Sequence, residues 1–331
     1  MDTMADDLLS EIQAVGTEIE LLRSASENLQ DYIPLLRWLP NNAKRKRAQG
    51  LRERRDGYLD QLMQRTRGMI EKGTDNSCVA SAIYKDEENK LNDVELKSVC
   101  LSLVSGGFST LAGTLTSCIG SLSTAEGQEW QDMAYEDIKR HYSSVEDAWS
   151  ESFQDERSPV LNAIIHEATR YYTISAMNLP RKAVTEIDWD GAKIPPKTMI
   201  LVNLQAANHD TDHFGPNANN FSPARFLNPK FLSSSGPLHF SFGAGSRACS
   251  GQILAHRLMY TALLRILSVF RIEASKAQPP ETNYIEYNAS KSALVAVPKE
   301  FNVRLVVRDA GVLNRCLAEA ERRTAPGRED M

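Results

Sequence analysis

The stretch Phe240–Gly251, with the sequence FSFGAGSRACSG, decides which fold we expect. Its glycines let the backbone turn sharply and approach a flat ligand closely. A long amphipathic helical pattern begins directly behind Cys249. The dipole and the free N–H groups at a helix start stabilise a thiolate, which can bind a metal ion. Arg247, two residues earlier, carries a guanidinium group suited to pair with a carboxylate.

These residue types at this spacing favour a haem site. The pattern is F-x-x-G-x-R-x-C-x-G, formed by Phe242, Gly245, Arg247, Cys249 and Gly251. The thiolate would bind iron, the arginine a propionate, and the aromatic ring would lie against the ligand loop; a thiolate ligand favours O–O cleavage. A lone cysteine is more often a small buried hydrophobe. The five matched positions reverse that preference.

The motif resembles the haem-binding signature of the cytochrome P-450 monooxygenases, and other positions agree in the family's order. Glu167 and Arg170 in HEATR match its E-x-x-R pair, and their spacing puts both on one helix face. Arg225 in FSPARF matches the arginine that completes a structural triad with them. Arg181 in NLPRKA matches the position that usually contacts a haem propionate.

The uncharged stretch Ser98–Ala125 resembles the family's central I helix. Thr110 in SGGFST matches the threonine that helps to deliver protons to dioxygen, and Gly106 and Gly107 match small residues that open a local kink. The family usually has an acidic residue immediately before the threonine, where this chain has Ser109. A serine hydroxyl cannot supply the same charge, so the departure implies slower turnover or uncoupling toward peroxide.

The same stretch raises the question of a membrane span, because it is long enough to cross a bilayer. Its many Ser, Thr and Gly residues disfavour lipid, so we expect a buried central helix of a soluble protein. The chain begins MDTMADDLLSEIQ, which has neither a basic n-region nor an apolar h-region. We therefore expect no membrane anchor and a location that is cytoplasmic or peripheral at the endoplasmic reticulum.

Composition excludes several classes of protein. The net charge of −5 provides no global basic field, so we expect no nucleic-acid partner. The five cysteines include no CxxC pair, which argues against a disulfide framework or zinc ribbon and favours a reducing compartment. The basic run KRKR at residues 44–47 indicates a solvated helix face, because acidic residues follow it closely. A nuclear signal or a docking patch for an acidic partner is the alternative interpretation.

Two short patterns resemble metal motifs but favour other interpretations. HEATR is close to the zinc motif H-E-x-x-H, but Arg170 stands where the second histidine would be. His209 and His213 in HDTDH lie in a segment rich in Asn and Pro, which favours a solvated turn over a metal site.

The predicted fold is mainly α with small β-sheets: a cytochrome P-450 fold lacking its N-terminal anchor, its N-terminal sheet and its B/C-helix region. We expect one partial domain over 1–315 and a polar tail over 316–331. The expected parts of the domain are the I helix at about 93–123, the K helix at about 159–173, the meander at about 208–230, the haem-ligand loop at 240–251 and the L helix at about 250–268.

The resemblance implies a haem-thiolate monooxygenase that uses haem b (iron protoporphyrin IX), O2 and electrons from NADPH through NADPH-cytochrome P-450 reductase. NLQDYIPLLR, LRERRDGYLDQL and LPRKAVTEIDWDGAKIP look similar to fungal phenylacetate-type hydroxylases, which implies a small aromatic or specialised (secondary) metabolite as substrate. The alternative is a truncated, catalytically inactive remnant or interaction protein of the same fold. It follows from the expected N-terminal shortening, since the missing part normally supplies propionate contacts and much of the substrate pocket.

Overall fold

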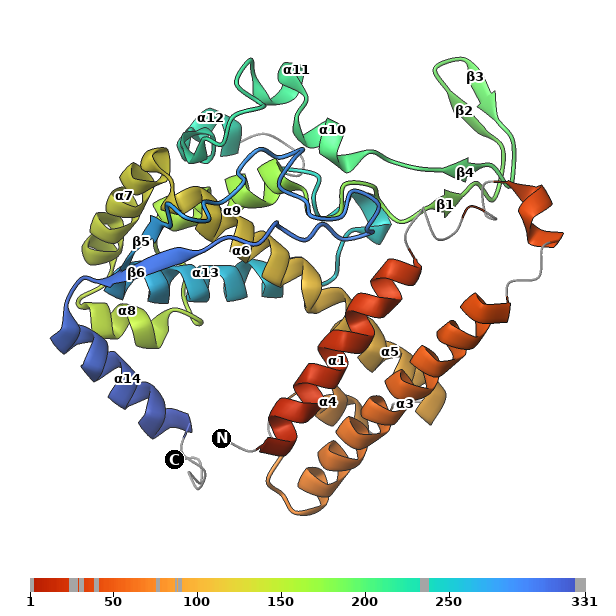
Figure 1. The fold of residues 1–331 in the computed structure, drawn as a ribbon, viewed down its shortest axis with the longest axis horizontal. Helices are drawn as coiled ribbons and strands as arrows, with labels where there is room; N and C mark the ends of the chain where they lie inside the picture. Colours follow the sequence, from red (N-terminus) through yellow and green to blue (C-terminus); the bar gives the residue numbers. More distant parts are fainter. Residues whose placement is uncertain are drawn as a thin grey trace. The chain divides into compact units, whose positions relative to one another are not determined.

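The computed structural model describes residues 3–23, 29, 33–38, 42–75, 78–86, 88, 91–232 and 238–324. The chain forms two compact units, one of residues 1–109 with 291–295 and the other of residues 110–290 with 296–331. Helices dominate, and the described residues contain three two-stranded antiparallel sheets (Figure 1). The prediction of a mainly α fold with small β-sheets is confirmed. The boundary between the units falls inside the stretch for which we expected one domain.

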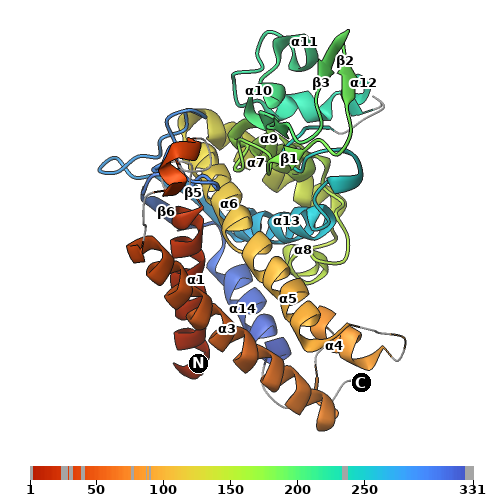
Figure 2. The same cartoon turned by 90° about the vertical axis from the view of Figure 1, so that its right-hand side faces the viewer.

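The first unit is a group of helices. They are α1 (Thr3–Leu22), the 3-10 helix η2 (Pro34–Trp38), α3 (Asn42–Glu71), α4 (Val79–Lys85) and α5 (Asp93–Gly107). Helices α1 and α3 lie side by side in both views (Figure 1 and Figure 2). Val15, Leu51 and Leu59 are buried in the core of this unit. Arg54 adds a two-pronged ion pair to Glu11, with Nε–Oε1 and Nη2–Oε2 distances of 2.7 and 2.8 Å.

The expected I helix is divided in the structure. Asn92 caps α5 and exchanges hydrogen bonds with Glu95 in a capping box, as the pattern KLNDVE predicts. The helix ends at Gly107, and α6 (Ser109–Ser123) begins after Phe108. The interruption therefore lies directly beside the Gly106–Gly107 pair and directly before Ser109.

Together α5 and α6 are long and apolar enough to cross a membrane by length and composition, and 11% of their most apolar window is buried. The second half of this stretch has a different environment. Cys118 and Leu122 of α6 lie in the core of the second unit. The hydroxyl groups of Ser121 and Tyr172 share a buried hydrogen bond of 2.5 Å. Contacts of this kind fit a core helix, where polar groups need partners.

The second unit contains the remaining helices, except for Ser109, the first residue of α6, which belongs to the first unit. They are α6, α7 (Ala125–His141), α8 (Val145–Glu151), α9 (Pro159–Tyr172), α10 (Leu204–Asn208), α11 (Thr211–Phe214), the 3-10 helix η3 (Pro223–Leu227), α12 (Pro229–Leu232), the 3-10 helix η4 (Gly245–Arg247), α13 (Gln252–Val269) and α14 (Ala310–Thr324). Helices α6, α7, α9 and α13 share one hydrophobic core. The buried Gln131 side chain donates to the carbonyls of Leu122 and Ile272, at 2.7 and 2.8 Å, and so joins this core to strand β5.

The sheets are short and lie in the second unit. Strand β1 (Arg181–Lys182) pairs with β4 (Met199–Ile200), β2 (Ile187–Trp189) with β3 (Ala192–Ile194), and β5 (Phe270–Ala274) with β6 (Val303–Val307). The turn between β2 and β3 places Asp190 and Gly191 at φ values of 49° and 76°. An Asp-Gly pair with positive φ suits a tight hairpin, which explains the position of this turn in VTEIDWDG.

The end of the chain differs from our expectation. Helix α14 runs from Ala310 to Thr324, so the expected start of a polar tail at residue 316 lies inside a helix. Cys316 is buried, and Arg315 forms a 2.8 Å ion pair with Glu146 of α8. The apolar residues of α14 recur at helical spacing, and their packing stabilises a helix that is otherwise rich in charge.

Candidate functional site

In the predicted haem-ligand loop, two glycines adopt backbone conformations that other residues rarely adopt. Gly243 and Gly245 have φ values of 72° and 70°, in the left-handed region that favours glycine. The N–H of Cys249 donates to the carbonyl of Phe242 at 2.8 Å, which folds the loop back on itself. Gly251 is the N-terminal cap of α13, two residues after Cys249. The Cys249 thiol is exposed, and it precedes the first residue of this helix by three positions.

The surroundings of Cys249 fit an iron porphyrin. Ile253 and Leu254, in the first turn of α13, are 77% and 55% exposed and offer apolar surface to a flat ligand. Arg247 in η4 and Arg181 in β1 are exposed. The segment before Arg181 reaches the loop, since the Asn178 amide lies 3.7 Å from where a Cβ of Gly243 would be. A soft thiolate donor, two guanidinium groups and apolar surface match the iron, the propionates and the ring of haem.

Behind the loop, Glu167 and Arg170 form a completely buried ion pair on α9. Their side chains meet at two points, Nε–Oε2 and Nη2–Oε1, each 2.8 Å apart. The remaining donors of Arg170 bond to backbone carbonyls, including those of Asn208 and Ala218, at 2.6 and 2.8 Å. Glu167 thus compensates the buried charge of Arg170, and the hydrogen bonds of Arg170 to backbone carbonyls fix the segment that follows α10.

Arg225, the third residue of the predicted triad, lies beside Glu167. Its Nε lies 3.6 Å from Oε2 of Glu167. Its Nη2 donates to the carbonyl of Asn217 at 3.0 Å, and its Nη1 donates to that of Phe214. Burial lowers the pKa of the Arg225 guanidinium group, while the charge of Glu167 opposes this effect. All three residues therefore brace α9 against the segment between α10 and η3.

Asn208 connects this buried pair to the ligand loop, and the sequence alone did not identify it. Its side-chain amide donates to the hydroxyls of Thr173 and Ser241, both at 2.9 Å, and its carbonyl oxygen accepts from the N–H of Phe240 at 2.7 Å. Its own backbone carbonyl accepts from Arg170. The only sequence signal is that Asn208 stands in an asparagine-rich stretch, AANHD, which does not distinguish it from its neighbours.

Three histidines gather behind the loop, and no pattern in the sequence predicts their contact. The ring centroid of His166 lies 4.7 Å from that of His256 and 5.7 Å from that of His239. Burial, together with nearby His256, lowers the pKa of His166 to about 4. Burial likewise lowers the pKa of His239 to about 3, with its histidine neighbours adding to the effect. These side chains are therefore neutral at physiological pH.

The HDTDH segment holds a packed histidine rather than a solvated one. The ring of His209 stacks on Tyr284 with centroids 3.7 Å apart, and its Nε2 lies 2.9 Å from the carbonyl of Tyr171. Burial lowers the pKa of His209. Within the described part of the chain, no group of three or more His, Cys, Asp or Glu side chains is arranged to hold a metal ion.

The predicted proton-delivery residues begin α6. The carbonyl of Thr110 accepts a hydrogen bond from the Thr114 hydroxyl at 2.9 Å. The Ser109 hydroxyl donates to Oε1 of Glu20 on α1 at 2.5 Å. Ser109 is thus in contact with a carboxylate that lies 89 residues away in the sequence.

The first unit also contains a hollow of about 330 Å³ with mixed chemistry. Its apolar part is formed by Ile19, Leu22, Ala48, Leu51 and Leu101. Its polar part is formed by Arg23, Arg52, Arg55, Ser102 and Ser105. Asp56 lies 2.6 Å from Nη2 of Arg55 and 3.6 Å from Nε of Arg52. Among the residues that the structure describes, three guanidinium groups line the hollow and Asp56 pairs with two of them, so the hollow suits an apolar ligand with a negative end.

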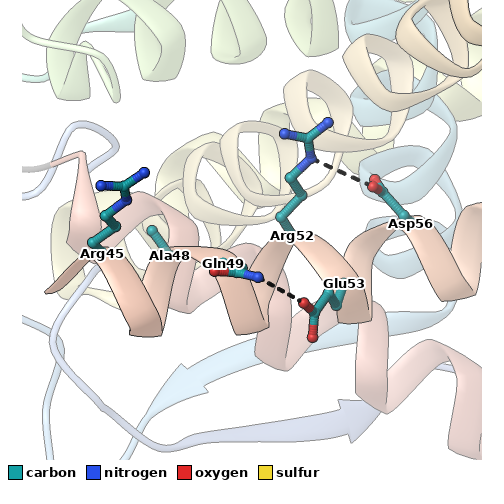
Figure 3. A pocket seen from close by; sticks show the side chains of 6 residues that line it. All are labelled: Arg45, Ala48, Gln49, Arg52, Glu53 and Asp56. Atoms are coloured by element: carbon teal, nitrogen blue, oxygen red, sulfur yellow. Dashed lines mark hydrogen bonds and ion pairs between the residues drawn. The ribbon is translucent and has the colours of Figure 1, made fainter. Parts of the chain in front are cut away.

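A shallower depression runs along α3 itself (Figure 3). In Figure 3 the Arg52 side chain points toward Asp56, and Gln49 points toward Glu53, with a hydrogen bond of 3.3 Å. At the start of this helix, Arg47 pairs with Glu18 at 3.4 Å. Charges of both signs alternate here, which agrees with a solvated helix face.

Comparisons with known proteins show the family to which this chain is similar. The family described as cytochrome P-450 matches residues 1–303. The chain is 39% identical to "Phenylacetate 2-hydroxylase" of Emericella nidulans over 96% of its own length and 61% of the relative's. It is 34% identical to "3-hydroxyphenylacetate 6-hydroxylase" of the same organism, over 92% of its own length and 57% of the relative's. The chain thus spans about three fifths of the length of these relatives, and it belongs to the cytochrome P-450 family.

Proposed function

We propose that this chain is a haem-thiolate monooxygenase that hydroxylates a small aromatic acid or a related specialised metabolite. The observation that carries the proposal is the exposed Cys249 thiol at the start of α13, with arginine and apolar side chains nearby, in a chain of this family. The overall reaction converts R–H, O2, NADPH and one proton into R–OH, water and NADP+. Bound haem b would supply the iron chemistry that activates dioxygen.

Each predicted site residue has a role in this proposal. Cys249 would bind the haem iron through its sulfur, and Phe242, Gly245 and Gly251 shape the loop that presents it. Arg247 and Arg181 pair with the propionates.

Two further sets of residues complete the proposed site. Thr110, with Ser109, passes protons to the oxygen atom that leaves as water. Glu167, Arg170 and Arg225 keep the scaffold behind the loop rigid, which preserves the position of the ligand.

Two observations support an aromatic carboxylate as the substrate. The relatives described above are named as hydroxylases of phenylacetate and of 3-hydroxyphenylacetate. The hollow of the first unit combines apolar side chains with three arginines, a combination that suits an aromatic ring with a carboxylate. We propose NADPH-cytochrome P-450 reductase as the electron donor.

The experiment is turnover by the haem-reconstituted chain with the reductase and NADPH, using phenylacetate as the probe. We expect a monohydroxylated product whose new oxygen comes from isotopically labelled O2, and no product with Cys249→Ala. Phenylacetamide is the matched neutral substrate and is expected to react less efficiently, through a higher KM. Labelled oxygen from water in the product, or equal product from the Cys249→Ala variant, would refute a haem-thiolate oxygenase.

A further inference from the structure

The contact between Ser109 and Glu20 joins two helices at the point where the apolar stretch is interrupted. Glu20 lies in the last turn of α1, and Ser109 is the first residue of α6, directly after Phe108. The hydroxyl donates to Oε1 of the carboxylate at 2.5 Å, and both side chains are partly buried. A short hydrogen bond to a carboxylate is a charge-assisted one, which is stronger than a bond between neutral groups.

The two groups differ in what they can do with a proton. A serine hydroxyl donates and accepts hydrogen bonds, but it does not hold or release a proton readily near neutral pH. A carboxyl group changes its protonation state and can act as a general acid. The partial exposure of Glu20 leaves it in reach of water, from which it can be reprotonated.

We propose that Glu20 is the proton donor to Ser109, so that a carboxylate from α1 serves the proton path that Ser109 and Thr110 begin. This inference rests on the proposed function, in which each turnover delivers two protons to the oxygen atom that leaves as water. When Glu20 is protonated, the hydrogen bond reverses, so that the carboxyl group donates to Oγ of Ser109. Glu20 then gives its proton to this oxygen while Ser109 releases its own hydroxyl proton toward Thr110. Ser109 ends neutral, and ionised Glu20 takes a new proton from water. The electrons come from NADPH through the reductase.

A merely structural role for this contact predicts a different pattern. If Glu20 only ties α1 to α6, a glutamine should replace it well, because the amide oxygen still accepts a hydrogen bond from Ser109. If Glu20 delivers protons, glutamine should fail, because it carries no acidic proton. Glu20→Gln therefore separates the two roles, and Glu20→Asp tests whether a carboxylate restores delivery.

The experiment measures product formed and hydrogen peroxide released per NADPH, with phenylacetate as substrate. For Glu20→Gln we expect the product to fall about tenfold or more while peroxide rises, since the loss of a positioned acid slows proton transfer. Ser109→Asp in the Glu20→Gln background supplies a carboxylate at the neighbouring position and should restore coupling. The matched control is Glu18→Gln, which lies on the same helix but pairs with Arg47 and Arg54 instead of Ser109.

A second measurement tests the contact without haem or turnover. Thermal unfolding of the haem-free chain is compared for Glu20→Ala, Ser109→Ala and the double variant, and non-additive shifts of Tm are expected for residues in contact. Additive shifts would overturn the proposal, as would unchanged coupling in Glu20→Gln. If the wild-type chain forms no product at all, the proposed function fails. If the wild-type chain and Glu20→Gln form product with the same coupling, only the inference about Glu20 fails.

Discussion

The pair formed by Glu167 and Arg170 shows how much a single residue contributes to this fold. Both side chains are fully buried, and the guanidinium group uses its donors on Glu167 and on backbone carbonyls. Removing one charge leaves the other buried and uncompensated, which is far less favourable than losing a pair in water.

We predict that Glu167→Gln lowers the free energy of unfolding by about 3–5 kcal/mol, because Arg170 then keeps a buried charge without its counter-ion. The matched control is Glu273→Gln, which breaks an exposed pair with Arg304 and should lower the free energy by no more than about 1 kcal/mol. Urea unfolding followed by circular dichroism measures both values. Equal losses would contradict a supporting role for the buried pair.

Asn208 acts through the ligand loop rather than through charge. We predict that Asn208→Ala increases amide hydrogen exchange across residues 240–251 by roughly 5- to 150-fold, equivalent to about 1–3 kcal/mol for buried groups that lose their partners. Asn283→Ala is the control, since the side-chain oxygen of Asn283 accepts from the nearby N–H groups of Ile285 and Glu286, outside the ligand loop. Unchanged exchange in the loop would show that Asn208 does not hold it.

The sequence alone selected candidate residues that lie close together in short motifs, such as Cys249 with Arg247 and Glu167 with Arg170. It could not identify Asn208 or Glu20, because their partners lie far away in the sequence and no local pattern marks the contact. The functional assignments of the motif residues remain predictions for the tests described above.

At the scale of helices, boundaries were predictable where the signals are local. Helix α9 begins at Pro159 after the cap Ser158, which accepts from the N–H of Leu161 at 3.2 Å. The break at Phe108 lies beside the local Gly106–Gly107 signal, whereas the helix that includes the buried Cys316 is stabilised by contacts with a distant segment, such as the ion pair of Arg315 with Glu146. Local propensity does not contain that information.

The histidine cluster between α9 and α13 predicts how stability depends on pH. His166 and His239 have folded pKa values of about 4 and about 3, below the ordinary value of 6.5. Above pH 6.5 both are neutral in the folded and unfolded states and add no pH dependence. As the pH falls below 6.5, only the unfolded chain gains these protons, so stability is lost until the folded pKa values are passed.

The prediction concerns how steeply the free energy of unfolding falls between pH 6.5 and pH 4. Each of the two histidines should contribute up to about 1.4 kcal/mol per pH unit to the loss of stability. His166→Asn should reduce the slope of the free energy of unfolding against pH, measured by urea titrations at several pH values. Glu156 and Arg257 are the charged groups beside His256, and the variant leaves them unchanged. An unchanged slope in His166→Asn would show that His166 already titrates normally.

At the scale of the whole molecule, the sequence predicted the mainly α fold class but not the division of the chain into two compact units. Hydrophobic periodicity predicts the helices and the small sheets. The motifs that appear in the family's order along the chain indicate the family. The division into two compact units follows from neither, because residues 291–295 join the first unit although they are far from it in the sequence. Long-range association of this kind depends on tertiary contacts, and periodicity reports only local structure.

The central claim is that Cys249 of this chain binds haem iron as a thiolate. The most direct measurement is the absorption spectrum of the haem-reconstituted chain after reduction and addition of carbon monoxide, beside the Cys249→Ala variant. We predict a Soret band in the thiolate position, red-shifted well beyond that of histidine-ligated haem, and its loss in the variant. A wild-type chain that takes up no haem, or whose band lies at the position typical of a lost thiolate, would contradict the account.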